Sequence, residues 1–189
     1  MVTDRMIKKS QQLLLKLARN TLEASFHDED PDTSACSHLT QLRGCFVSLH
    51  KKNQLRGCIG FPKAIMPLFE EVIAATKAAA FEDPRFEPVI EKELADIVIE
   101  ISVLTRPELI KVTDAQEYLE KIEIGRDGLI IKSNGFSGLL LPQVATEYKM
   151  TGKQFLEALC EKAGLSKDAW KNPDVKIYKF RAEIMSEQE

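Results

Sequence analysis

The sequence lacks any long run of apolar residues. A segment that crosses a bilayer needs about 20 consecutive, mainly apolar residues, and no stretch of this 189-residue chain approaches that length. The opening stretch, MVTDRMIKKSQQLLLKLARN, interrupts its leucines with polar residues at helical spacing, unlike the core of a signal peptide. We therefore expect a protein that stays in the cytoplasm.

Neither sign of charge dominates the chain, and cysteine is scarce. The 26 basic and 29 acidic residues are mixed along the sequence, so no basic block marks a nucleic-acid interface and the composition disfavours nucleic acid as a partner. Without an export signal, four cysteines in a chain of this length do not indicate a disulfide framework. We expect reduced thiols at Cys36, Cys45, Cys58 and Cys160.

The common catalytic and metal-binding motifs are also missing. There is no GxSxG, HExxH or HxxxH pattern, and none of the three histidines has a position that marks it as a general base. Cys36, His38, Cys45 and Cys58 have the chemistry of a zinc site, but they lack the two close ligand pairs typical of one. We therefore expect neither a bound metal nor a cofactor.

The segment GRDG at residues 125–128 has the glycines of a phosphate-binding loop but not its context. It lies between two strand-like runs rather than before a helix, and no lysine and serine or threonine follow it at the spacing of a Walker loop. We predict a hairpin turn there, with a further turn at Asn134-Gly135.

Apolar periodicity divides the chain into strands and helices. Strands joined by hairpins and interleaved with helices indicate an α+β fold with mostly antiparallel sheets and packed helices. The length predicts one domain over residues 1–189, which can consist of two lobes. The expected elements are a helix over residues 4–26 capped by Thr3, a loop over 27–41, a hairpin over 44–60, a helix over 67–80, an irregular loop over 81–88, a strand over 95–104, a short helix over 113–121, strands on both sides of 125–128, a strand over 136–142, a helix over 152–163, a short helix around Trp170 and a terminal strand over 174–184.

The stretch NQLRGCIGFP in the first hairpin sets an arginine and a cysteine between two glycines. If Lys51 pairs with Gln54, period-two alternation puts Arg56 and Cys58 on the same face as Cys45, whereas a shift of one residue would reverse that relation. An arginine on the same face would favour the thiolate form of Cys58 that nucleophilic and redox cysteines use. The alternative is that Cys58 is a small residue in a tightly packed strand.

Arg85 lies on a loop that two prolines stiffen, in the motif DPRF. An arginine held in this way can present its planar fork to a carboxylate or phosphate group of a ligand. It can equally form a salt bridge to Asp83 or Glu87 that holds the loop. The sequence leaves both interpretations open.

The hexapeptide LRGCIG at residues 55–60 resembles the signature of the AMMECR-type protein family. Further blocks resemble the family pattern in family order, and together they cover about residues 10–182. These blocks are FVSLHKKNQLRGCIGFP, IMPLFEEV, AAFEDPRFEPV, ELADIVIEISVLTRPELI, DGLIIKSNGFSGLLLPQVATEY and FLEALCEKAGLSKDAW.

The resemblance implies a cytosolic α+β protein with a larger and a smaller lobe, in its compact prokaryotic form, and with no established biochemical activity. It also implies an association with a Memo-like protein and a radical SAM enzyme. The motif positions carried over are Arg56 and Cys58 as a candidate catalytic pair and Gly57, Gly60, Asp83, Arg85 and Gln143 as candidate binding residues. One departure, Lys149-Met150-Thr151 in place of Gly-Trp-Asp, argues against a site that uses an aromatic side chain there.

These observations support one functional hypothesis and two alternatives. The first is a protein that binds a partner or a small ligand, in a pathway with a Memo-like protein and a radical SAM enzyme. The second is an enzyme that uses Cys58 as a thiolate nucleophile or redox centre. The third, a nucleic-acid-associated protein, is disfavoured by the charge distribution.

Overall fold

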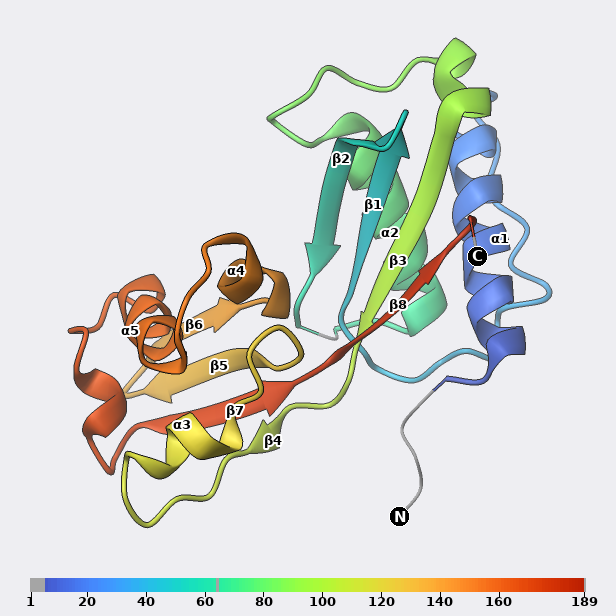
Figure 1. The fold of residues 1–189 in the computed structure, drawn as a ribbon. Helices are drawn as coiled ribbons and strands as arrows, with labels where there is room; N and C mark the ends of the chain where they lie inside the picture. The colour runs from blue at the N-terminus through green and yellow to red at the C-terminus, as the bar shows by residue number, and fades with distance from the viewer. Residues whose placement is uncertain (1–5, 64, 189) are drawn as a thin grey trace. The chain divides into compact units, whose positions relative to one another are not determined.

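The computed structural model describes residues 6–63 and 65–188 and has the predicted α+β fold, with two antiparallel four-stranded sheets (Figure 1). The chain divides into unit 1, Met1–Thr105 with Glu183–Glu189, and unit 2, Arg106–Ala182. The elements are α1 Lys8–Ala24, β1 Cys45–Lys51, β2 Gln54–Phe61, α2 Leu68–Phe81, η1 Glu91–Asp96, β3 Ile97–Leu104, β4 Glu108–Leu109, α3 Glu117–Lys121, β5 Gly128–Ser133, β6 Phe136–Leu140, α4 Pro142–Glu147, α5 Gly152–Lys162, η2 Ala169–Lys171, β7 Lys176–Phe180 and β8 Ala182–Ser186.

Unit 1 is a sheet in the order β2-β1-β3-β8 with α1 and α2 packed on one side (Figure 1). The small-residue stripe predicted for α2 is buried against this sheet, because alanines let the helix approach the strands closely. The isoleucines of β3 and Cys45, Val47 and Leu49 of β1 fill the same core. Among the described residues of unit 1, no helix covers the opposite side of the sheet, which we call the uncovered face.

The register of the β1–β2 hairpin differs from the prediction. Lys51 pairs with Gln54 as expected, but Leu49 pairs with Gly57, so Arg56 is an extra residue in β2. Such a β-bulge shifts all later pairs by one residue. Cys58 therefore pairs with Ser48 and lies on the uncovered face, so the prediction that it shares a face with Cys45 is wrong.

Unit 2 is a sheet in the order β4-β7-β5-β6, and its core includes Trp170, Phe155 and Leu156. β5 and β6 form a hairpin around Asn134 and Gly135, as predicted, and both residues have positive φ angles, 43° and 86°. The helix predicted over residues 152–163 is confirmed as α5.

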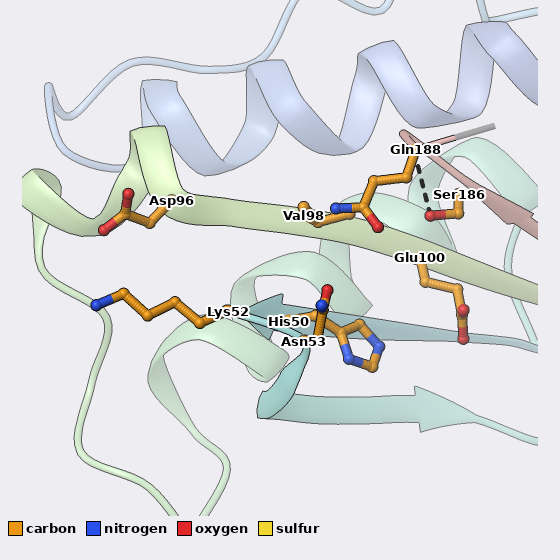
Figure 2. Close-up of a pocket in the computed structure, with 8 residues that line it drawn as sticks. All are labelled: His50, Lys52, Asn53, Asp96, Val98, Glu100, Ser186 and Gln188. Carbon is orange, nitrogen blue, oxygen red and sulfur yellow. Dashed lines mark hydrogen bonds between the residues drawn. The ribbon is translucent and has the colours of Figure 1, made fainter.

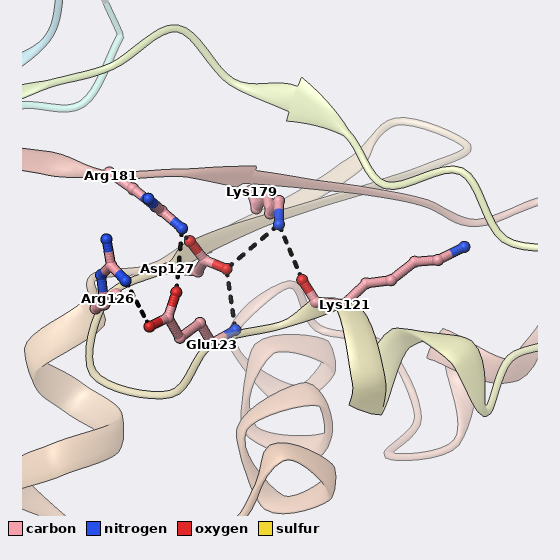
Figure 3. Close-up of polar contacts among 6 residues, drawn as sticks. All are labelled: Lys121, Glu123, Arg126, Asp127, Lys179 and Arg181. Atoms are coloured by element: carbon pink, nitrogen blue, oxygen red, sulfur yellow. Dashed lines mark hydrogen bonds and ion pairs between the residues drawn. The ribbon is translucent and has the colours of Figure 1, made fainter. Parts of the chain in front are cut away.

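The hairpin predicted around residues 125–128 is wrong, because the segment before it is a turn after α3 and not a strand. Asp127, which is fully buried, holds this turn (Figure 3). Its carboxylate accepts hydrogen bonds from Arg181 Nε at 3.0 Å and from the backbone N–H of Glu123 at 3.0 Å, and it lies 3.6 Å from Lys179 Nζ. Ion pairs of Asp127 with Lys179 in β7 and with Arg181 just after it therefore hold the turn, directly before β5 begins to pair with β7 at Gly128.

Two further boundaries differ from the sequence prediction. The opening helix starts at Lys8, and its predicted cap, Thr3, lies outside the described residues. The predicted terminal strand is interrupted at Arg181, so that β7 joins the sheet of unit 2 and β8 the sheet of unit 1. None of the described helices has the length and apolar character that a membrane crossing requires.

Candidate functional site

The main chain of Cys58 is fixed by the DPRF loop. β2 is an edge strand, so one side of it has no neighbouring strand to satisfy its backbone groups. The Cys58 N–H donates to Asp83 Oδ2 at 2.8 Å, and Arg85 Nη2 donates to the Cys58 carbonyl oxygen at 3.2 Å. These two side chains take the place of a neighbouring strand at this one residue.

Asp83 and Arg85 also bind each other. Arg85 Nε lies 2.9 Å from Asp83 Oδ1 and Nη2 lies 2.7 Å from Oδ2, a two-pronged salt bridge. The hydrogen bonds from Arg85 hold the pKa of the Asp83 carboxyl well below its usual range, although burial acts in the opposite direction. The structure shows the salt bridge, one of the two interpretations of Arg85, with the guanidinium group of Arg85 bound to Asp83.

Arg56 fastens the same loop at a second point. Its Nη1 donates to the Glu87 carbonyl oxygen at 2.8 Å and its Nη2 to that of Pro88 at 3.3 Å. Its Nε and Nη2 donate to the nearly buried carboxylate of Glu93 at 3.2 and 2.9 Å. These hydrogen bonds, with a smaller contribution from Lys51, lower the pKa of Glu93 to about 2. The guanidinium of Arg56 is therefore engaged in holding residues 87–93.

The thiol of Cys58 differs from the other three. Its sulfur accepts a hydrogen bond from Ser48 Oγ at 3.2 Å, and the residue is half-buried. Cys36, Cys45 and Cys160 are 3%, 0% and 0% exposed, and burial raises the pKa of each of these thiols. Cys58 is thus the most accessible cysteine.

The two glycines of the motif have packing roles. A Cβ atom at Gly57 would lie 2.1 Å from the carbonyl oxygen of Ala79 in α2, and one at Gly60 would lie 2.4 Å from the ring of Phe46. Gly57 therefore lets α2 lie against β2, and Gly60 lets the Phe46 ring cover the strand on the uncovered face.

Gln143, the last of the seven predicted site residues, lies in unit 2, whereas the other six lie in unit 1. It is in the first turn of α4, after Pro142, and its Oε1 atom is buried without a hydrogen-bond partner among the described residues. The departure from the family pattern has a structural role, since Thr151 is the N-cap of α5 and accepts a hydrogen bond from the Gln154 N–H at 3.3 Å.

The uncovered face places polar residues that the sequence did not single out close to Cys58. Ser48 and Glu100 are its cross-strand neighbours in one row, and His50 lies in the next row opposite Val98. Figure 2 shows the His50 ring and the Glu100 carboxylate on the same side of the sheet. The β-bulge hid this grouping, because alternation without it assigns Cys58 to the other face.

This grouping is not a metal centre. Over residues 6–63 and 65–188, no set of three or more His, Cys, Asp or Glu side chains is arranged to hold a metal ion. Cys45 and Cys58, two members of the zinc set considered from the sequence, lie on opposite faces of the hairpin.

Comparison with known proteins identifies the family. The AMMECR1 family model matches residues 15–185. A protein of Methanocaldococcus jannaschii is 54% identical over 149 residues, covering 78% of this chain and 74% of that protein, and one of Thermoplasma acidophilum is 46% identical over 178 residues, covering 93% and 86%. The crystal structure of an uncharacterised protein from Pyrococcus horikoshii matches with a TM-score of 0.80 and 42% identity, covering 97% of this chain and 94% of that one. The chain therefore belongs to the AMMECR1 family, as its LRGCIG motif predicts.

Proposed function

We propose that this protein is a cytoplasmic binding protein that presents the Cys58 side chain to a small ligand or a partner protein. One observation carries the proposal: Asp83 and Arg85 fix both backbone groups of Cys58, while the residue stays only half-buried and its sulfur accepts a hydrogen bond from Ser48. A side chain held in place before binding loses little conformational entropy when it is bound. Cysteine that serves only as packing is usually fully buried, as the other three are here.

The partners we propose are a Memo-like protein and a radical SAM enzyme, which the family resemblance suggests. The test is a pull-down of each purified partner by the wild-type chain and by Cys58→Ser. We expect the variant to lose binding, because the hydroxyl is smaller and less polarisable than the thiol. Ser137→Ala, an exposed substitution on β6, is the control and should bind like the wild type. Repeated recovery of neither partner by the wild type would contradict the proposed pathway.

The alternative of an enzyme with Cys58 as its nucleophile has one observation in its favour. Ser48 Oγ lies within hydrogen-bond distance of the sulfur, and a donated hydrogen bond stabilises a thiolate. Against it, the bonds of Arg56 to Glu93, Glu87 and Pro88 engage the cation that the sequence suggested as its activator. Alkylation of Cys58 measured against pH decides between the two: a midpoint equal to that of a free thiol would remove the enzyme alternative.

A further inference from the structure

A hollow of about 420 Å³ lies on the uncovered face of unit 1, at the end where the β1–β2 hairpin turns (Figure 2). This volume is within the range of about 300 to 1,000 Å³ that small-molecule sites occupy. Its wall is formed by residues of β1, the hairpin turn, η1, β3 and β8, and by Gln188 after β8. Cys58 does not line it, so the inference below does not depend on the proposed function.

Three polar side chains in this wall have no partner within the described part of the chain. His50 Nε2 is buried without a hydrogen bond. The carboxylates of Glu100, which is half-buried, and Asp96, which is exposed, make neither a hydrogen bond nor an ion pair with another described residue. Of the three, only His50 Nε2 is a buried atom, and a buried polar atom left without a partner is unfavourable, so a ligand that supplies the missing bond gains affinity.

The charge of the lining selects the kind of ligand. Asp96 and Glu100 contribute two negative charges, and Lys52 contributes the one ammonium group among the described lining residues. Carboxylates bind ammonium and guanidinium groups through charge-assisted hydrogen bonds, which are stronger than neutral ones. An anion would instead be repelled by both carboxylates.

We propose that this hollow binds a small molecule that carries an ammonium or guanidinium group. Glu100 binds the cationic nitrogen, and a neighbouring polar atom of the ligand forms a hydrogen bond with His50 Nε2. Asp96, four residues before Glu100 and so about 13 Å away along the strand direction, adds negative charge at the other end of the hollow. The cross-strand position of His50 beside Val98, with Glu100 two residues further along β3, keeps the two groups on one rigid surface.

The test uses agmatine and ethanolamine as cationic probes, and acetate and phosphate as anionic ones, with NMR of the histidine rings and calorimetry on the full chain. We expect both amines to bind saturably at concentrations up to about 10 mM and to shift the ring signals of His50. The exposed His27 and His38 serve as internal controls and should not shift. This readout needs no variant and so does not depend on whether a variant folds.

Variants then identify the binding groups. Glu100→Gln should weaken amine binding by about tenfold, because it loses the charge-assisted bond. Asp96→Asn should weaken it by only about threefold, because it removes a more distant negative charge. Glu70→Gln removes the same charge from an exposed position on α2 and should bind like the wild type. The proposal is overturned if the amines do not saturate, if acetate or phosphate binds as well as they do, or if Glu100→Gln keeps wild-type affinity.

Discussion

At the scale of single residues, Asp83 is the side chain on which the arrangement of Cys58 depends. It is 4% exposed and accepts hydrogen bonds from the Cys58 N–H and from Arg85. Replacing it by asparagine keeps the shape but removes the charge, and the amide can accept only at one atom. The loop should then release the edge of β2.

We expect Asp83→Asn to lower the free energy of unfolding by about 1 to 3 kcal/mol, the usual effect of losing hydrogen bonds to a charged group. The measurement is urea denaturation, with hydrogen exchange at the Cys58 amide as a local readout that should become faster. Asp30→Asn, in the exposed loop after α1, is the matched control. Unchanged exchange at Cys58 would show that the DPRF loop is not held in this way.

The lowered pKa of Glu93 makes the stability of the fold depend on pH. Its pKa is lowered from 4.5 to about 2, mainly by hydrogen bonds from Arg56. A carboxyl whose folded pKa lies below its unfolded value stabilises the fold above the unfolded pKa, and this stability is lost as the pH falls through the folded pKa. Melting temperatures should therefore fall between pH 4.5 and pH 2. Glu93→Gln should be less stable at pH 7 and fall less over that interval, and an equal fall in both proteins would contradict the assignment.

At the scale of elements, the packing of α2 on β2 depends on a single glycine. A Cβ at position 57 would lie 2.1 Å from the Ala79 carbonyl oxygen, and main chain cannot move aside as a flexible side chain can. Gly57→Ala should therefore destabilise the protein by about 2 kcal/mol or more. The measurement is again the free energy of unfolding in urea.

Gly152 at the start of α5 is the control for this substitution. A Cβ there would meet only the Leu119 side chain, at an ordinary contact distance of 3.5 Å. Gly152→Ala should stabilise the protein by about 0.4 to 1 kcal/mol, since alanine restricts the unfolded chain. If Gly57→Ala is tolerated as well as Gly152→Ala, then α2 does not pack on β2 as described.

Periodicity and turn chemistry were sufficient to predict most of these elements. The buried face of α2, the isoleucine alternation of β3 and the Asn134-Gly135 turn all follow from local rules. The bulge at Arg56 could not be predicted, because an extra residue in a strand has no pattern of its own and is decided by tertiary contacts, here those of Arg56 with the loop at residues 87–93.

The candidate site was also predictable only in part, because a motif identifies residues close together in sequence and not those that strand pairing brings together. The motif selected Cys58, Asp83 and Arg85, which the structure brings together. It could not select Glu100, which lies far along the chain and is beside Ser48 only through strand pairing. The division of residues 174–184 between two sheets was likewise invisible, since β7 and β8 form one continuous alternating pattern.

At the scale of the whole molecule, the chain forms two units with separate hydrophobic cores. Unit 2 is inserted in unit 1, because β8 returns to the first sheet after β7. The single tryptophan, Trp170, is in the core of unit 2, so its fluorescence reports on that unit. Circular dichroism reports on both.

Leu22→Ala, in the core of unit 1, should lower the free energy of unfolding by about 2 to 5 kcal/mol. It should shift the circular dichroism transition more than the fluorescence transition. Leu156→Ala, in the core of unit 2, should shift the fluorescence transition more. The comparison is made by urea denaturation of each variant with both probes. Coincident transitions in all three proteins would show that the two units unfold as one.

The central claim is that the fold presents the thiol of Cys58 while it buries the other cysteines. The most direct test is alkylation of the native protein with iodoacetamide, followed over time by peptide mass spectrometry. Cys58 should be modified at least about tenfold faster than Cys36, Cys45 and Cys160, which serve as buried internal controls and should react only when the protein unfolds. A Cys58 thiol as protected as those three would contradict the claim and leave it a packing residue.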